Sequence, residues 1–200
     1  MSKNLVLIFT RNPELGKVKT RLAKTIGNEA ALAVYTFLLN HTKQVTQNGT
    51  FDKAVYYSVK VHENDIWDKN TYQKFLQQGD NLGERMQHAF QQAFDNGYEK
   101  VVIIGSDLFD LQTSHIYEAF DQLAKNEVVI GPAEDGGYYL LGLKKVHPEI
   151  FKNKAWGTST VRQDTLHDLQ NVSLHLLETL NDIDVFEDIK NIEIFDQFYK

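Results

Sequence analysis

The sequence of 200 residues contains no cysteine, and only three prolines, two tryptophans and two methionines. The lack of cysteine excludes disulfide frameworks, thiolate catalysis and cysteine metal sites. Long apolar runs are also missing, since the N-terminal run extends only from Leu5 to Phe9 and is too short for a signal-peptide core or a membrane span. We therefore expect a cytoplasmic protein without a membrane span.

Several catalytic signatures are absent as well. The seven histidines form no HxH or HExxH pair, which argues against a zinc site. No GxSxG nucleophile elbow occurs either. The net charge of -6 provides no general basic field, so we expect no nucleic-acid partner. In such an acidic chain, a local cluster of basic residues is more informative.

The length and the 42% hydrophobic content suit one domain spanning residues 1–200. Short apolar runs alternate with segments of helical periodicity. The pattern predicts strands at 4–10, 53–59, 100–105, 127–131, 137–143 and 173–178. It predicts helices at 28–47, with Asn28 as the cap, at 82–95, 114–125 and 158–170, and in the tail from Val185. This alternation predicts a three-layer α/β/α fold with a mostly parallel open sheet.

Ligands of such sheets bind beyond the carboxyl ends of the strands. Polar and glycine residues gather after the predicted strands at 11–21, 105–107, 131–137 and 181–184. Because these segments are expected at the same edge of the sheet, their convergence predicts a binding site there.

The first segment is a basic loop. Arg11, Lys17, Lys19 and Arg21 lie within eleven residues, and Gly16 allows the backbone to approach a ligand closely. Cations and free backbone N–H groups bind phosphate oxygens, so the loop is a candidate phosphate site. It is not a Walker A loop, since a valine follows Lys17. An ordinary solvated basic loop is the alternative.

The second segment is Gly105-Ser106-Asp107, at the end of the strongest predicted strand. Asp107 could hold a divalent ion that bridges nucleotide phosphates, and Ser106 could contact the nucleotide. Helix capping is the alternative, and Asp110 is better placed for it.

The third segment contains Asp135, Gly136 and Gly137. Asp135 could act as a base on an acceptor hydroxyl or as a metal ligand, and the glycines let the backbone pass close to a ligand. The alternative is a plain Asp-Gly hairpin turn.

Near the predicted helix at 82–95, Gly83 and Arg85 could contact a base or phosphate. A capping box is compatible with this, with Asn81 or Asp80 as the cap and Glu84 reaching back.

Two further features are less specific. In Asp182-Ile183-Asp184 the alternate carboxylates suit a metal, although N-capping by Asp184 is favoured from the sequence alone. Trp156 could line an acceptor pocket or lie in the core.

Taken together, these motifs resemble a bacterial glycosyltransferase-like family associated with radical-SAM and selenium-associated proteins. The matching segments are RNPELGKVKTRLA, QGDNLGERM, VVIIGSD, GPAEDGGYYLLGL, WGTSTV and LNDIDVFEDI, which cover nearly the whole chain. The family is similar to the nucleotide-diphospho-sugar transferase (GT-A) superfamily, with its Rossmann-like fold. Relatives there include nucleotidyltransferases such as the molybdenum cofactor guanylyltransferase.

The resemblance implies roles by position. Lys17, Lys19 and Arg21 would bind phosphates, and Asp107 would bind Mg²⁺ or Mn²⁺. Asp135-Gly136-Gly137 would border donor and acceptor, and Asp184 would be a second metal ligand. The family usually has proline two residues after the metal aspartate, where this sequence has Phe109.

The sequence thus predicts a metal-dependent transferase that uses a nucleotide-activated donor, in the first place a glycosyltransferase using a nucleotide-diphospho-sugar and a small-molecule acceptor. One alternative is a nucleotidyltransferase that joins an NTP to a phosphorylated acceptor and releases pyrophosphate. A non-catalytic nucleotide-binding domain is the other alternative. The sequence leaves the base, the sugar, the acceptor and the oligomeric state open.

Overall fold

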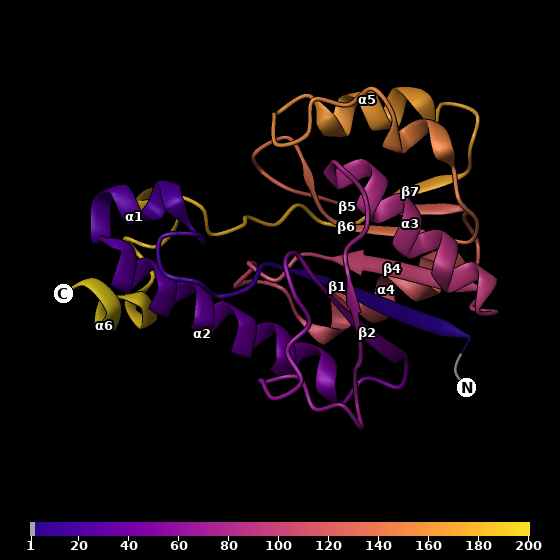
Figure 1. The fold of residues 1–200 in the computed structure, drawn as a ribbon. Coiled ribbons are helices and arrows are strands. Elements are labelled where there is room, and N and C mark those ends of the chain that lie inside the picture. The colour runs from indigo at the N-terminus through magenta and orange to yellow at the C-terminus, as the bar shows by residue number, and fades with distance from the viewer. Residues whose placement is uncertain (1–2) are drawn as a thin grey trace.

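A computed structural model describes residues 3–200, within which seven strands form one sheet (Figure 1). Their order is β3-β2-β1-β4-β6-β5-β7. Strand β6 is antiparallel to its neighbours β4 and β5, and the other neighbouring strands are parallel. The strands are β1 (Asn4–Thr10), β2 (Asp52–Tyr57), β3 (Gln73–Leu76), β4 (Lys100–Ile104), β5 (Val128–Pro132), β6 (Tyr138–Leu143) and β7 (Leu174–Leu176). The predicted mostly parallel open sheet is confirmed.

Helices cover both faces of this sheet, which gives the three layers visible in Figure 1. One face packs against α2 (Asn28–Gln47) and α4 (Thr113–Leu123). The other packs against α3 (Leu82–Asp95), the 3₁₀ helix η1 (Pro148–Phe151) and the end of α5 (Val161–Asp168). The remaining helices are α1 (Thr20–Ile26), η2 (Phe186–Asp188), η3 (Glu193–Phe195) and α6 (Asp196–Tyr199).

The continuous apolar run of β1 explains its central place in the sheet. Successive side chains of a strand point to opposite faces. Val6 and Ile8 accordingly lie in the core under α2 and α4, whereas Leu5 and Leu7 lie in the core under α3. A strand buried on both faces needs apolar residues at every position, as the sequence shows.

The C-terminal segment differs from its prediction. Instead of one amphipathic helix from Val185, it forms two short 3₁₀ helices and the one-turn helix α6. Ile183, Ile189 and Phe195 are each almost fully buried in a third apolar cluster with α1 and α2. In Figure 1 the segment runs from β7 across to α1 and α2. These anchors are six residues apart, a spacing that does not stay on one face of an α-helix, so the segment docks without forming one regular helix.

Smaller differences concern ends and short elements. Helix α1 and the edge strand β3 were not predicted, since both are short and β3 lacks a clear alternation of apolar residues. Helix α5 covers 161–168 rather than 158–170. The N-cap of α2 is Gly27 and not Asn28. The N-cap of α4 is Gln112 and not Asp110. No helix within residues 3–200 is long and apolar enough to cross a membrane.

Candidate active site at the carboxyl edge of the sheet

The loops that follow β1, β4 and β5 meet the C-terminal segment 180–185 at one edge of the sheet. Backbone hydrogen bonds fix this meeting: the amide of Ile183 donates to the carbonyl of Asp107 at 3.1 Å, and the amide of Glu134 donates to the carbonyl of Leu180 at 3.1 Å. Ion pairs of Lys19 with Asp107 and of Arg21 with Asp184 bring in the loop after β1, so the predicted convergence of the four segments is present in the fold.

The basic loop after β1 has a defined shape. Gly16 adopts a φ of 71°, and Lys19 adopts the left-handed conformation, with φ 47° and ψ 44°, as the N-cap of α1. The side chain of Val18 between them is buried in the main core. A lysine in this conformation carries backbone strain of about 1 kcal/mol or more, which often marks a functional position. The loop is thus held by its buried valine rather than free in solvent.

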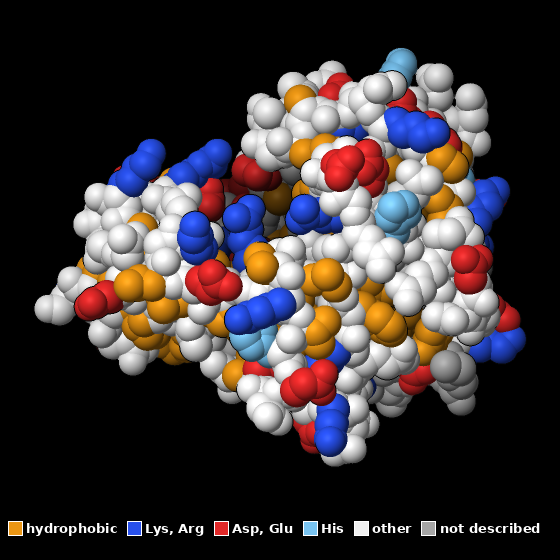
Figure 2. Space-filling view, viewed as in Figure 1, with side chains coloured by type: hydrophobic (Ala, Val, Ile, Leu, Met, Phe, Trp, Pro, Cys, Tyr) orange, Lys and Arg blue, Asp and Glu red, His pale blue; other side chains and the backbone are white. Residues whose placement is uncertain are grey.

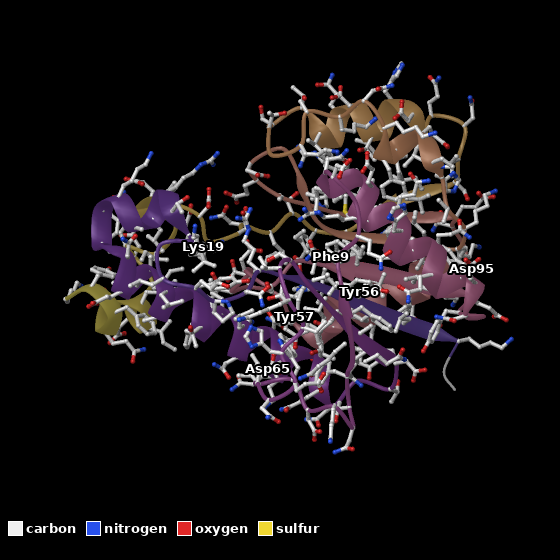
Figure 3. The ribbon with its side chains drawn as sticks, viewed as in Figure 1. Phe9, Lys19, Tyr56, Tyr57, Asp65 and Asp95 are labelled. Carbon is white, nitrogen blue, oxygen red and sulfur yellow. The ribbon has the colours of Figure 1, made fainter. Side chains whose placement is uncertain are left out.

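The side chain of Lys19 points into the protein. Its Nζ donates to Oδ2 of Asp107 at 2.8 Å, and its side chain is only 6% exposed, against 36% for Asp107. Figure 3 shows Lys19 on the α1 side of the site and Phe9 on the sheet side. The structure therefore joins two residues that the sequence assigned to separate tasks, one to phosphate and one to metal.

A second ion pair lies nearer the surface. Arg21 Nη1 donates to Oδ2 of Asp184 at 2.8 Å, with side-chain exposures of 66% and 34%. The predicted capping by Asp184 is wrong, because the carboxylate of Asp188 accepts from the amides of Asp184 and Val185. An exposed pair of this kind contributes little to stability, so both side chains can change partners at small cost.

Tyr35 of α2 holds the loops after β1 and β4 together, and sequence reasoning missed it. Its hydroxyl accepts from the amide of Arg11 at 2.9 Å and lies 3.2 Å from the hydroxyls of both Thr10 and Ser106. Burial raises the pKa of Tyr35, so it stays a neutral hydrogen-bonding group. Ser106 is itself buried and hydrogen-bonded to Tyr35, so its side chain stabilises the loop after β4 and is not exposed to solvent.

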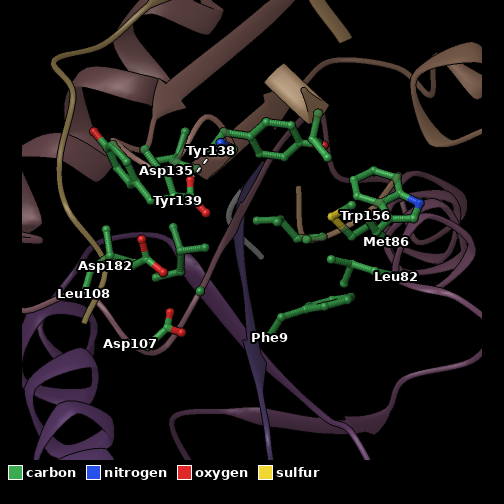
Figure 4. A pocket seen from close by; sticks show the side chains of 18 of the residues that line it. Phe9, Leu82, Met86, Asp107, Leu108, Asp135, Tyr138, Tyr139, Trp156 and Asp182 are labelled. Carbon is green, nitrogen blue, oxygen red and sulfur yellow. Dashed lines mark hydrogen bonds between the residues drawn. The ribbon is translucent and has the colours of Figure 1, made fainter. Parts of the chain in front are cut away.

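Beside these loops lies a cavity of about 220 Å³. Asp107, Asp135 and Asp182 line one side of it, and aromatic and aliphatic side chains line the other (Figure 4). Figure 2 shows Lys and Arg side chains gathered beside a hollow with an apolar floor. The cavity thus combines carboxylates with an apolar wall next to the basic loop.

Asp182 rather than Asp184 faces this cavity. Burial, together with the negative charges of Asp107 and Asp135, raises the pKa of Asp182 to about 6. Its position follows from the backbone: Ile183 between the two aspartates is anchored in the core. The sequence motif contained Asp182, but nothing in the sequence distinguished it from Asp184, whose metal role stays a prediction.

Asp135 lies in the turn between the antiparallel strands β5 and β6. Its Oδ1 accepts from the amide of Gly137 at 2.7 Å, and Gly136 adopts a φ of 92°. The hairpin-turn interpretation is therefore correct, and Asp135 also borders the cavity. The two interpretations of this segment are compatible.

The helix-start motif at α3 caps the helix and ties it to the preceding turn, and the predicted contact of Arg85 with a base or phosphate stays a prediction. Asn81 is the N-cap and accepts from the amide of Glu84, as predicted; the Glu84 side chain reaches back to the amide of Asp80, one residue before the amide that a capping box uses. Arg85 Nε donates to the carbonyl of Gly79 at 2.9 Å, which ties the helix to the preceding turn.

Gly83 is buried within the first turn of α3. A Cβ on it would lie 2.3 Å from the carbonyl oxygen of Phe151 and 2.7 Å from the Trp156 ring. Its lack of a side chain thus seats Trp156 against the helix. The predicted nucleotide contact of Gly83 stays a prediction.

Phe109 braces the loop of Asp107 in place of the family's proline. Its ring lies 5.1 Å from that of Phe195 and 6.0 Å from that of Phe37, as an aromatic cluster with α2 and the C-terminal segment. Phe109 itself is partly buried, whereas neighbouring Leu108 and Leu111 are fully buried. Side-chain packing therefore fixes this turn, which a proline would have fixed through its backbone ring.

The donor set suits a hard cation held largely by its substrate. Within residues 3–200 no three His, Asp or Glu side chains are placed to hold a metal ion together. Mg²⁺ commonly takes one or two protein carboxylates and completes its shell with phosphate and water. Asp107 fits that arrangement at the edge of the cavity, provided that Lys19 releases it.

With this sheet order and these loops at one edge, the chain has the fold of nucleotide-diphospho-sugar transferases. The chain belongs to the family described as "uncharacterized protein conserved in bacteria (DUF2064)", whose model matches residues 41–158. That segment contains Asp107 and Asp135 but not the basic loop. The association with radical-SAM proteins stays a prediction.

Solved structures agree with this assignment. A protein from Desulfovibrio desulfuricans G20, provisionally named a nucleotide-diphospho-sugar transferase, is 35% identical, with a TM-score of 0.84 over 92% of this chain and 84% of that one. A 4-diphosphocytidyl-2C-methyl-D-erythritol synthase from Anaerococcus prevotii DSM 20548 is 11% identical, with a TM-score of 0.58 over 98% and 96%. A CMP:2-keto-3-deoxy-manno-octonic acid synthetase complexed with CTP is 10% identical, with a TM-score of 0.55 over 98% and 99%. The last two share the fold. No curated protein matches the chain.

Proposed function

We propose that the protein is a metal-dependent transferase that uses a nucleotide-activated donor, namely a glycosyltransferase using a nucleotide-diphospho-sugar. The observation that carries this proposal is the contact between Lys19 of the basic loop and Asp107 at the end of β4. A phosphate-binding cation and a metal-binding carboxylate must lie within reach of the same diphosphate, and these two groups are 2.8 Å apart.

The basic loop would bind the donor's diphosphate. Lys17 is exposed, Arg21 is largely exposed, and Lys19 stands behind them at the sheet edge. Hydrogen bonds between such cations and phosphate oxygens are about twice as strong as neutral ones. Arg21 would exchange Asp184 for phosphate with little loss, since their pair is exposed.

Asp107 would hold Mg²⁺ or Mn²⁺, an ion that supplies positive charge to the leaving diphosphate. Lys19 would then turn from Asp107 to a phosphate oxygen, so its charge stays paired in both states. Ser106, bonded to Tyr35, would keep the Asp107 loop in place during this exchange.

Asp135 would orient the acceptor hydroxyl and take its proton. The acceptor oxygen forms the bond to the anomeric carbon while the bond from that carbon to the diphosphate oxygen breaks. The electron pair leaves with the diphosphate, where the cations of the basic loop stabilise it. Asp135 lines the cavity and is held there by a hydrogen bond from the amide of Gly137 to one carboxylate oxygen, which supports its role as the base.

Nucleotidyl transfer is the second candidate. Several proteins that share the fold are named as cytidylyltransferases or as synthases of CMP-linked and cytidylyl products, and one holds CTP. Four cations in one loop suit a triphosphate as well as a diphosphate. The replacement of the family's proline by Phe109 gives little support to the non-catalytic alternative, because the Phe109 ring packs against Phe195 and braces the Asp107 loop.

Thermal shift assays separate these functions. We expect UDP or GDP with Mn²⁺ to raise the melting temperature and CTP or GTP to have a smaller effect. A preference for a triphosphate, with pyrophosphate released on adding a phosphorylated acceptor, would instead establish nucleotidyl transfer. No response to any of these nucleotides at millimolar concentration would refute both enzymatic functions.

A further inference from the structure

The cavity beside Asp107 has two unlike walls. The three carboxylates of the cavity, those of Asp107, Asp135 and Asp182, stand on one side beside Leu108 and Tyr139, and no lysine or arginine is among the described residues that line it. Phe9 and Trp156 stand on the other side with Leu82, Met86 and other apolar side chains (Figure 4). A binding surface with this division prefers a ligand with an apolar face and hydrogen-bond donors along one edge.

We propose that this cavity is the acceptor subsite and that it selects an uncharged ring compound whose hydroxyl group points toward Asp135. That the ligand is the acceptor of the transfer rests on the proposed function. The chemistry predicted for the ligand comes from the residues that line the cavity. It excludes phosphorylated acceptors, which the proposed function alone leaves open.

The size of the cavity suits a single ring. An apolar cavity of about 150 Å³ is large enough to bind benzene. The cavity here measures about 220 Å³, which leaves space for ring substituents. Aromatic side chains give such a ring a large, rigid contact area at low entropic cost, and carboxylates accept hydrogen bonds from its hydroxyl groups.

The charges of the cavity argue against an anionic ligand. Lys19 is the cation in contact with this acidic side, and its Nζ is paired with Asp107 at 2.8 Å. In the proposed function Lys19 and the metal ion on Asp107 are engaged by the donor's diphosphate, so a phosphate group in the cavity would face Asp135 and Asp182 without a cation of its own. Like charges brought together in this way lower affinity and discriminate against the wrong ligand.

The aromatic wall is held in place by the same contacts that hold Asp135. Gly83 lets the Trp156 ring pack on α3, since a Cβ there would come within 2.7 Å of it. The start of α5, which follows the loop of Trp156, is tied to the turn of Asp135, because Arg162 donates to the carbonyls of Ala133 and Gly136 at 2.9 Å and 3.0 Å.

A Cβ on Gly136 would likewise lie 2.3 Å from the carbonyl oxygen of Ser159, so this turn packs directly on that loop. The spacing between aromatic ring and carboxylate is therefore fixed by packing on both sides. A fixed spacing of this kind is what lets a site distinguish ligands by shape.

Two matched pairs of probes test the proposal: methyl glucoside with its phosphate ester, and benzyl alcohol with benzyl phosphate. Binding is measured by ligand-observed NMR with the full chain, with and without UDP and Mn²⁺. We expect at least one neutral ring to bind at millimolar concentration and its phosphate ester to bind about tenfold more weakly or worse. Trp156→Ala should weaken binding of the neutral ring about tenfold.

Trp67→Phe is the matched control, because Trp67 is buried in the core on the other face of the sheet and should leave ring binding unchanged. Asp135→Asn should reduce the difference in affinity between the neutral ring and its phosphate ester. If Asp135→Asn also weakened folding, its melting temperature would show this separately from the ratio of the two affinities.

Three results would overturn the proposal: a phosphate ester that binds as well as its neutral ring, full binding by Trp156→Ala, or no ring binding at all. Displacement of the ring by UMP alone would also overturn it, since the cavity would then hold the nucleoside. Ring binding in a protein that ignores every nucleotide would support the cavity's selectivity and refute the proposed function instead.

Discussion

The pair formed by Lys19 and Asp107 makes a quantitative prediction about folding. Lys19 has a side chain only 6% exposed, whereas Asp107 is 36% exposed. Removing the acid leaves a largely buried ammonium without its partner. Breaking a fully buried pair costs about 3–5 kcal/mol. Because Asp107 is partly solvated and a lysine stem can swing outward, we reduce this to about 1–3 kcal/mol for Asp107→Ala.

The reverse substitution should cost less. Lys19→Met keeps the apolar stem and leaves only a carboxylate that water reaches, so we expect a loss below about 1 kcal/mol. The double variant should resemble Lys19→Met alone. Loss of Asp107 also relieves its repulsion of Asp182, but we expect this gain to be smaller than the loss of a direct 2.8 Å contact.

Urea denaturation of the four proteins at neutral pH measures these free energies of unfolding as a double-mutant cycle. Additive effects of the two single variants would contradict the argument, as would an Asp107→Ala protein that is more stable than the parent. Either result would mean that the buried ammonium has another stabilising partner.

Three further variants test other parts of the site. Burial and the charges of Asp107 and Asp135 raise the pKa of Asp182 from 3.8 to about 6. The folded protein therefore holds this proton more tightly than the unfolded chain and loses stability as the pH rises from 3.8 to about 6. Asp182→Asn should abolish this loss, measured by urea denaturation at several pH values. Gly83→Ala should cost about 1–3 kcal/mol in unfolding free energy, because its Cβ would meet backbone at 2.3 Å. Tyr35→Phe should cost about 1–3 kcal/mol and weaken nucleotide binding, since it unties the two loops.

Matched controls make these outcomes specific. Asp184→Asn should leave the pH-dependent loss of stability that comes from Asp182 in place, because Asp182 and not Asp184 lines the cavity. Gln91→Ala on the exposed side of α3 should leave stability nearly unchanged. Tyr72→Phe removes a buried hydroxyl bonded to Thr46, far in sequence from the loops, and should affect stability but not nucleotide binding. The same response in a variant and its control would refute the corresponding explanation.

The sheet could be predicted because its strands are buried on both faces. Continuous apolar runs such as 4–10 and 100–105 leave few alternatives to a central strand. The C-terminal tail could not be predicted in the same way. Its anchors Ile183, Ile189 and Phe195 are recognisable as apolar, but only the tertiary surface of α1 and α2 decides that they dock without a regular helix.

The candidate site was likewise predictable only in part. The sequence predicted correctly which loops meet at one edge of the sheet, because each of these loops follows a predicted strand. It could not show that Lys19 contacts Asp107, since residues 88 positions apart meet only through the fold. The choice between Asp182 and Asp184 also depends on where the intervening backbone is anchored.

Titration calorimetry of UDP in the presence of Mn²⁺ tests the central claim most directly, with the parent protein, Asp107→Asn and Lys17→Ala. We expect the parent to bind UDP more tightly with Mn²⁺ than without it. Asp107→Asn should lose this metal dependence, and Lys17→Ala should weaken binding while keeping it. Equal UDP affinity in all three proteins, with and without Mn²⁺, would contradict the account.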